Sequence, residues 1–186
     1  TTGGMSDGGY GQGAVWGDFD GDGDLDLYQA NMAVGGPAPN HLLRNDGAGV
    51  FTDIGPSTGT DDDGSARSVA WVDYDNDGDQ DLYLANSNDG ANVLFRNDGG
   101  WRFTNVTGRA GLDENNRRFS YAASWEDYDR DGDLDLYVAN DFGRNNLYQN
   151  QLAQTGRVRF VDIAEEAGVV DIGPGMSACW SDYNND

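Results

Sequence analysis

Short apolar and aromatic runs recur along the chain, separated by polar segments rich in Gly, Asn and Asp. In the first unit they lie around Val15–Trp16, from Leu27 to Asn31, from Asn40 to Asn45 and from Phe51 to Ile54. Each run is shorter than an ordinary helix and has the aromatic and aliphatic composition of a strand. The pattern predicts four strands in each unit and an all-β fold.

The whole unit returns about every 55 residues, as the spacing of one aspartate shows: Asp18, Asp73, Asp127 and Asp182 are 55, 54 and 55 residues apart. A tryptophan precedes each of them by two positions. Units of four antiparallel strands at this spacing are typical of β-propeller blades, whereas the alternative, an extended β-solenoid, usually has shorter repeats. We expect a glycine-rich segment at 1–13, repeats at 14–67, 68–121 and 122–176, and the truncated start of a fourth repeat at 177–186.

The turns indicate which ends of the strands lie together. Asp46-Gly47 and Asp98-Gly99 separate the third and fourth strands and favour tight hairpins, while the third unit has a longer connection from Gln151 to Gly156. If the strands of a blade run up and down in order, these turns share one end with the aspartate-rich loop between strands one and two. The connections near 30–40, 86–92 and 140–146 then lie at the opposite end.

The aspartate-rich loop carries the chemistry. In each complete copy, five aspartates occupy alternate positions around a glycine. Such carboxylates repel one another unless a cation lies among them, and calcium takes six to eight oxygen ligands. Three complete loops therefore predict three calcium ions, with a possible partial fourth site. The candidate ligands are Asp18, Asp20, Asp22, Asp24 and Asp26; Asp73, Asp75, Asp77, Asp79 and Asp81; Asp127, Asp129, Asp131, Asp133 and Asp135; and Asp182, Asn184 and Asp186.

The residues at particular loop positions limit which metal ion and which type of binding loop are expected. The residue at position seven is expected to bind through its backbone carbonyl, so the carboxylates of Asp24, Asp79 and Asp133 should lie behind the ligands or face solvent. The loop is not an EF-hand, because the twelfth position holds Gln29, Leu84 or Val138 instead of a bidentate Glu. Magnesium prefers a small, water-rich octahedral shell, and zinc prefers nitrogen and sulfur ligands.

The net charge of −22 comes largely from these loops, which hold 17 of the 33 acidic residues when the partial copy is included. A generally acidic surface, as in halophilic proteins, is an additional influence that the absence of lysine would suit. The charge disfavours nucleic acid as a partner. No apolar run has the roughly 18 residues of a membrane span. Cys179, the single cysteine, excludes an intrachain disulfide.

The residues above also carry a family resemblance. Asp-x-Asp-x-Asp-Gly-x-x-Asp followed by Leu-Tyr-x-Ala-Asn, and then Asn-x-Leu-(Phe/Tyr)-(Arg/Gln)-Asn, resembles FG-GAP/VCBS repeats, in particular those of cartilage-acidic-protein-like proteins and more distantly those of integrin α-subunits. The resemblance spans about Ala14 to Asp186. It implies a calcium-bearing β-propeller, commonly seven-bladed, that is exported and serves in adhesion or recognition. Because three complete repeats are too few for a closed ring, we expect a longer parent chain or self-assembly.

Three functions follow as expectations. The first is a secreted or cell-surface scaffold for adhesion or protein recognition, in which calcium is structural. The alternatives are a glycan-binding module, with its ligand on the face opposite the metal loops, and a subunit of an extracellular filament. The candidate residues of the ligand face are Arg117, Arg118, Phe119, Phe142 and Arg144, and Asn105-Val106-Thr107 is a glycosylation sequon.

An enzyme is not expected. Gly4-Met5-Ser6-Asp7-Gly8 matches a nucleophile elbow but follows no predicted strand. The single histidine, His41, aligns with Val93 and Asn146 in the other units, which favours a structural or surface role.

Overall fold

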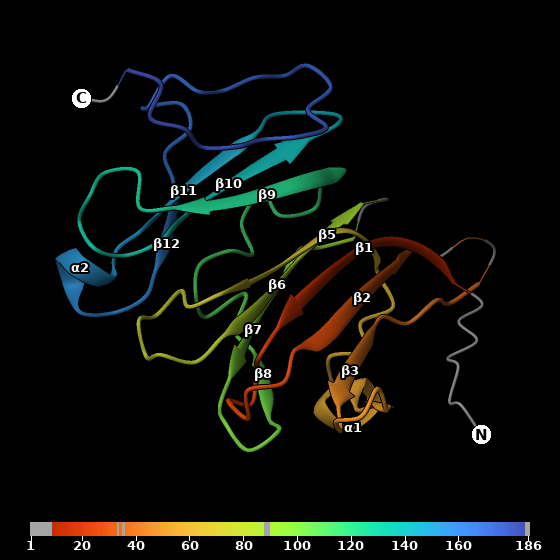
Figure 1. Ribbon diagram of the computed structural model, residues 1–186. Helices are drawn as coiled ribbons and strands as arrows, with labels where there is room; N and C mark the ends of the chain where they lie inside the picture. The colour runs from red at the N-terminus through yellow and green to blue at the C-terminus, as the bar shows by residue number, and fades with distance from the viewer. Residues whose placement is uncertain (1–8, 33, 35, 88–89, 185–186) are drawn as a thin grey trace.

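Three four-stranded antiparallel sheets make up the molecule, as a computed structural model that describes residues 9–32, 34, 36–87 and 90–184 shows (Figure 1). The predicted all-β fold with propeller-type blades is confirmed. Blade 1 contains β1 (Tyr10–Gly17), β2 (Asp26–Met32), β3 (His41–Asn45) and β4 (Phe51–Asp53). Blade 2 contains β5 (Ser65–Val72), β6 (Asp81–Ser87), β7 (Val93–Asn97) and β8 (Phe103–Asn105). Blade 3 contains β9 (Ser120–Glu126), β10 (Asp135–Asn140), β11 (Asn146–Asn150) and β12 (Phe160–Asp162).

The strands of each blade pair in chain order. Two short helical turns, α1 (Gly55–Thr58) and α2 (Leu152–Thr155), follow β4 and β11. The metal loops join the first and second strands, and the turns between the third and fourth strands lie beside them. For example, the backbone N–H of Asn45, at the end of β3, donates to the carboxylate of Asp26, at the start of β2, over 2.8 Å. The aspartate loops and these turns therefore share one end of each blade.

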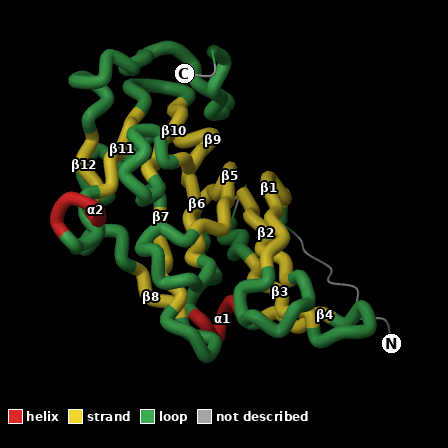
Figure 2. The backbone as a smooth tube through the Cα atoms, turned by 60° about the vertical axis from the view of Figure 1, so that its left-hand side comes forward, coloured by secondary structure: helices red, strands yellow, loops and turns green. Residues whose placement is uncertain are grey.

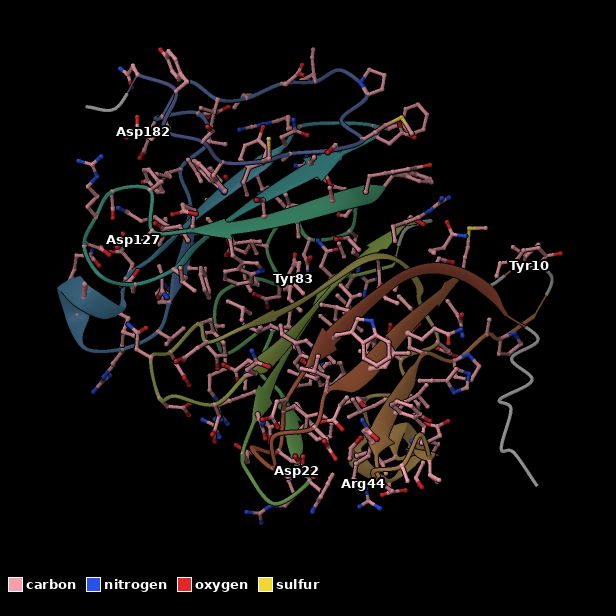
Figure 3. All side chains as sticks on the ribbon, viewed as in Figure 1. Tyr10, Asp22, Arg44, Tyr83, Asp127 and Asp182 are labelled. Carbon is pink, nitrogen blue, oxygen red and sulfur yellow. The ribbon has the colours of Figure 1, made fainter. Side chains whose placement is uncertain are left out.

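The blades stack face to face, and the core lies between them (Figure 2). β6 shows this most clearly, because all its residues are buried. Leu82 and Leu84 belong to the core shared with blade 1, whereas Tyr83 and Ala85 belong to the core shared with blade 3. Alternate residues of a strand point to opposite faces of the sheet. A strand covered on both faces is thus apolar throughout, and Tyr83 lies between blades 2 and 3 (Figure 3).

Aromatic contacts connect one blade to the next. Trp71 of β5 stacks on Phe19 of the first loop, with ring centroids 5.7 Å apart, and meets Tyr28 of β2 edge-on at 6.4 Å. These geometries are favourable for aromatic pairs. The same tryptophan position makes related contacts further along the chain, between Trp125 and Tyr83 at 5.5 Å, and between Trp180 and both Tyr128 at 5.8 Å and Tyr137 at 6.2 Å.

The first strands carry a second link between blades. The register of β1, β5 and β9 shifts at Gln12, Arg67 and Tyr121, so each strand has a bulge at the same place. The bulged side chains meet: Arg67 Nη1 donates to Gln12 Oε1 over 3.0 Å, and the Arg67 guanidinium lies 4.6 Å from the ring centroid of Tyr121. The bulges therefore align the blades at the end opposite the metal loops.

The two ends of the chain differ from the expected repeat boundaries. β1 begins at Tyr10, inside the segment 1–13 that we expected to precede the first repeat, because Tyr10 and Gly11 pair with Met32 and Asn31. Residues 1–8, which include the elbow-like Gly4-Met5-Ser6-Asp7-Gly8, lie outside the described residues. Residues 169–184 form no strand, although Trp180 occupies the inter-blade position, because the described part of this repeat contains no second strand to pair with.

Among the described residues, no helix has both the length and the apolar character needed to span a bilayer.

Candidate metal centres

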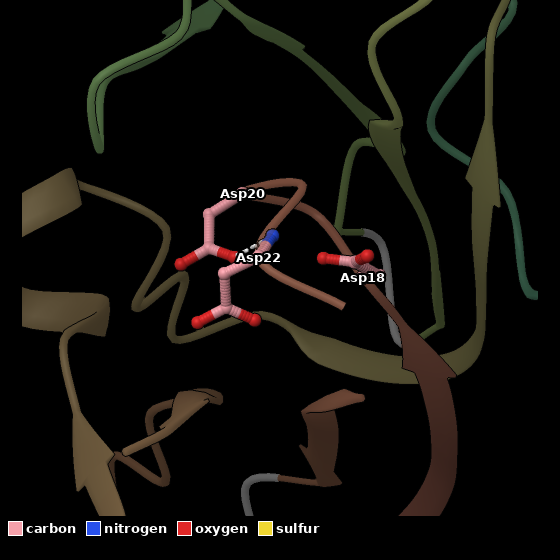
Figure 4. A group of neighbouring side chains, drawn as sticks. All are labelled: Asp18, Asp20 and Asp22. Atoms are coloured by element: carbon pink, nitrogen blue, oxygen red, sulfur yellow. Dashed lines mark hydrogen bonds between the residues drawn. The ribbon is translucent and has the colours of Figure 1, made fainter. Parts of the chain in front are cut away.

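Each of the three complete loops gathers carboxylates into a small space. Within each group, one carboxylate oxygen per residue lies within 4.8 Å of the others. Figure 4 shows the group in the first loop. Among the described residues the groups are Asp18, Asp20 and Asp22; Asp73, Asp75 and Asp81; and Asp127, Asp129 and Asp131. The molecule therefore has three places where acidic oxygens could hold one metal ion.

The first aspartate folds the loop around itself. The carboxylate of Asp18 accepts hydrogen bonds from the backbone N–H groups of Gly21 at 2.8 Å and Gly23 at 3.0 Å. Asp73 and Asp127 accept equivalent bonds from Gly78 and Gly132. The glycine at position six has φ between 93° and 96° in all three loops, a conformation that L side chains rarely adopt. The alternating sequence and its glycine thus determine the local turn.

The ninth aspartate joins the loop to the core. Asp26, Asp81 and Asp135 are fully buried at the start of the second strand. One oxygen of each accepts the backbone N–H at the end of the third strand over 2.8 Å. Burial raises the pKa of these carboxyls to about 6 in Asp26, about 8 in Asp81 and about 7 in Asp135. Removal from water disfavours the charged form, so these sites hold anionic groups at a cost.

Unpartnered oxygens show that a cation fits these residues. Asp81 Oδ2 and Asp135 Oδ2 are buried without a hydrogen-bond partner, and so are Asp75 Oδ1 and Asp133 Oδ1. A buried polar oxygen without a partner is costly, most of all when it is charged. A hard cation is the partner that an all-oxygen donor set would suit. The second and third loops pass this test directly, whereas Asp26 Oδ2 in the first loop accepts a long bond of 3.3 Å from Phe19 N.

The other candidate ligands differ between loops. Asp24 and Asp79 at position seven are exposed, but Asp133 is 1% exposed and accepts a bond of 2.7 Å from Ala153 N, at the start of α2. Asp77 is exposed and lies outside the oxygen group of its loop. Asp182 and Asn184 of the partial repeat are exposed and belong to none of the three groups, and Asp186 lies outside the described residues.

The sequence pattern shows Arg or Gln near the end of the third strand but does not predict that these side chains act around the loops. Arg44, at the same end of blade 1 as Asp22 (Figure 3), places its guanidinium 4.5 Å from the ring centroid of Trp101 in blade 2. Gln149 donates to Asp129, and Gln154 donates to Asp131. Gln149 occupies the strand position of Arg44, so aligning the units residue by residue would have revealed this difference.

In blades 2 and 3, the asparagine side chain at the end of the third strand also reaches the preceding blade. Asn97 Nδ2 donates to the backbone oxygen of Phe19 at 3.0 Å, and Asn150 Nδ2 donates to that of Tyr74 at 2.9 Å. Both acceptors are at position two of the preceding metal loop. The first and second metal loops are thus each held by their own blade and by the next one.

His41 has the structural surroundings of a strand residue. Its Nδ1 lies 2.7 Å from Asp53 Oδ2 on the adjacent strand. At the same place in blade 3, Asn146 Nδ2 donates to Asp162 Oδ2, also over 2.7 Å. Histidine and asparagine therefore make the same cross-strand contact, which requires no catalytic role.

At the opposite end of blade 3, four of the five predicted ligand-face residues come together. Phe119 and Phe142 form an edge-to-face pair with centroids 5.5 Å apart, and Phe142 is 64% exposed. Arg118 Nη1 donates to the backbone oxygen of Arg144 over 2.9 Å. The fifth residue, Arg117, forms an isolated bridge with Ala91. We call Arg118, Phe119, Phe142 and Arg144 the Arg–Phe cluster.

Asn105 of the sequon is exposed at the end of β8, and its side-chain oxygen accepts bonds from Thr107 N at 3.1 Å and Thr107 Oγ1 at 2.8 Å.

Comparison with known proteins gives matches along most of the chain. The sequence profile of the FG-GAP-like repeat matches residues 30–84 and 73–138, which together make up more than half of the chain. Cartilage acidic protein 1 from Mus musculus and from Homo sapiens are each 28% identical to this chain over 177 residues, or 91% of its length. The protein of the same name from Xenopus tropicalis is also 28% identical. The chain spans about a quarter of the length of these relatives, 26–27%.

Proposed function

The chain belongs to the FG-GAP-like repeat family, and we propose that its three aspartate loops bind calcium ions that stabilise a stack of β-blades serving as an extracellular recognition scaffold. Calcium would supply positive charge and a flexible oxygen coordination shell at the metal-loop end of each blade. The recognition function would then belong to other surfaces.

The unpartnered buried oxygens carry this proposal. Asp81 and Asp135 each use one oxygen to hold the end of the third strand and leave the other without a partner. Asp75 shares an oxygen group with Asp81, and Asp127, Asp129 and Asp131 form the oxygen group of the third loop. In a loop of this kind the carboxylates repel one another, so an ion that neutralises them favours the folded loop over the unfolded chain.

An ordered loop should also stabilise the packing of its blade against the next one. The residue at position two of each loop contacts the next blade, as Phe19 does when it stacks on Trp71 and accepts the amide of Asn97. A loop that is held in one conformation keeps this contact surface in place. Calcium bound in one blade would therefore stabilise the interface with the following blade.

Two considerations support an extracellular location. The relatives are named for cartilage, an extracellular tissue, and the repeat is of a type found in extracellular proteins. Oxygen-ligand sites of moderate affinity also fill at extracellular calcium concentrations but not in resting cytosol. We propose a non-enzymatic role, since the features that the three blades share are inter-blade packing and candidate metal ligands.

Removal of calcium tests the proposal. Chelation with EDTA should lower the melting temperature of the 186-residue chain by more than about 5 °C, because a ligand at a hundred times its Kd contributes about 2.7 kcal/mol per site. Circular dichroism during heating measures this. Adding back calcium should restore the temperature, and equimolar magnesium should restore less. Equal melting temperatures with calcium and with EDTA would refute calcium stabilisation.

Glycan binding at the Arg–Phe cluster is the second candidate function. The exposed Phe142 ring packs on Phe119, and Arg118 and Arg144 stand close to these two residues in the chain. The cluster thus combines an apolar surface with hydrogen-bond donors, which suits a sugar with acidic or hydroxyl groups. A glycan array probed with the calcium-loaded chain should give hits that Phe142→Ala abolishes. Tyr10→Ala, which changes another exposed aromatic on blade 1, is the control and should keep them. An array without hits removes this candidate.

A further inference from the structure

We infer that the third metal loop, Asp127–Asp135, is a separate class of site that binds calcium more tightly than the other two, because blade 3 holds its carboxylates with neutral donors from outside the loop. The inference rests on the proposed calcium binding. It concerns Gln149 and the α2 segment, whose bonds to the loop carboxylates have no counterpart among the described residues of blades 1 and 2. It also concerns Gln151, which donates to Gln149.

In blades 1 and 2, an arginine occupies the strand position that Gln149 holds in blade 3. Arg44 and Arg96 are the fourth residues of their strands and pair at 2.6 Å with Asp46 and Asp98, respectively. The positive charge of an arginine at this end of the blade would repel an incoming cation.

In blade 3, a neutral pair replaces the arginine and its aspartate. Gln149 occupies the position of Arg96, and Gln151 occupies that of Asp98. Gln151 Nε2 donates to Gln149 Oε1 over 2.9 Å, and Gln149 Nε2 donates to Asp129 Oδ2 over 2.6 Å. An amide can orient the carboxylate of Asp129 without bringing a positive charge to the site.

The longer connection of blade 3 adds two more donors. α2 lies beside the loop that joins β9 to β10 (Figure 1). Its Ala153 N–H donates to Asp133 Oδ2 over 2.7 Å, and Gln154 Nε2 donates to Asp131 Oδ2. The tight Asp-Gly turns of the other blades are too short to bring a residue to this position. Three neighbouring carboxylates of the third loop are therefore held from outside.

These contacts leave the oxygens that a cation needs. A carboxylate can accept bonds on both oxygens, and Asp133 Oδ1 and Asp135 Oδ2 stay buried without partners. Residues already held in place lose less conformational freedom when a ligand binds, so affinity rises. A loop whose carboxylates are preoriented in this way should thus bind calcium more tightly than the open loops of blades 1 and 2.

A calorimetric calcium titration of the metal-free chain tests the inference. We expect one site about tenfold tighter than the other two, which is the effect of one hydrogen bond to a charged group. Asp127→Ala should remove the tight site, whereas Asp73→Ala should remove a weak one. Three equal sites would overturn the inference and leave the proposed calcium binding intact. Absence of any binding would refute both.

Exchange variants attribute the difference to the named residues. Gln149→Arg with Gln151→Asp places the blade 2 pair in blade 3 without changing the net charge, and should weaken the tight site about tenfold. Arg96→Gln with Asp98→Gln makes the reverse exchange and should tighten one weak site. Gln154→Ala, on the exposed α2, should weaken the tight site alone, and Arg157→Gln, also exposed, should change none. Melting temperatures near that of the unaltered chain confirm folding. Unchanged affinity in both the first exchange and Gln154→Ala would overturn the assignment.

Discussion

At the scale of single residues, the two oxygens of the ninth aspartate have different tasks. In Asp81, one oxygen accepts the N–H of Asn97 at the end of β7, while the other is buried without a partner. The first contact completes the backbone hydrogen bonding of the blade, and the second oxygen is available to a cation. One side chain thus connects metal binding with blade structure.

A neutral replacement separates these two tasks. Asp81→Asn retains an oxygen for Asn97 N but removes the buried charge, so the variant should melt at or above the temperature of the unaltered chain in EDTA. In calcium it should gain less, because one of three sites has lost its ligand. Asp79→Asn, an exposed aspartate of the same loop, is the control and should keep nearly the full gain. A full calcium gain in Asp81→Asn, measured by heating, would contradict the role of Asp81.

At the scale of strands and loops, the blades are held together by residues at equivalent positions. The tryptophan of one blade packs on the aromatic residues of the preceding one, and the asparagine at the end of the third strand donates to its metal loop. Trp16 occupies the same position in blade 1 but is 55% exposed. Residues at equivalent positions should therefore contribute differently to the free energy of unfolding, depending on whether a neighbouring blade covers them.

This difference can be measured with a matched pair of variants. Trp71→Ala removes a ring packed against Phe19 and Tyr28 and should lower the free energy of unfolding by about 3 kcal/mol or more. Trp16→Ala removes an exposed ring and should cost less than about 1 kcal/mol. Urea denaturation in saturating calcium measures both. Equal losses would show that the inter-blade stack contributes no special stability.

At the scale of the whole molecule, charge and stacking act against each other. The net charge is −22, and the loops that carry most of it lie at one end of every blade. Three divalent ions carry six positive charges and would reduce the net charge to −16. Packing between the blades must overcome the remaining repulsion. Self-assembly through the exposed side of blade 1 stays a prediction.

Salt should therefore affect the metal-free and calcium-loaded chains differently. Raising NaCl from low to physiological concentration screens repulsion between exposed carboxylates, so the melting temperature in EDTA should rise. In saturating calcium the rise should be smaller, because bound calcium already offsets part of the loop charge. Parallel heating experiments at several salt concentrations give both slopes. A salt dependence that is equal in the two states would show that loop repulsion does not limit stability.

The sequence by itself determined the repeat, the four strands of each blade and the three aspartate loops. These features follow from local chemistry: residue alternation sets strands, and a glycine among aspartates sets the loop turn. An alignment of the repeats also shows that blade 3 has Gln149 where the other blades have arginine. The alignment does not show, however, that the Gln149 side chain donates to Asp129 in the metal loop.

Only the tertiary structure decided which equivalent residues differ in their burial and contacts. Trp71 is packed and Trp16 is exposed because only one of them has a preceding blade against it. Asp133 is buried and Asp79 is exposed because α2 covers one loop and a short turn leaves the other open. Such differences depend on neighbours far away along the chain, and burial and hydrogen bonding across that distance cannot be read from a local pattern.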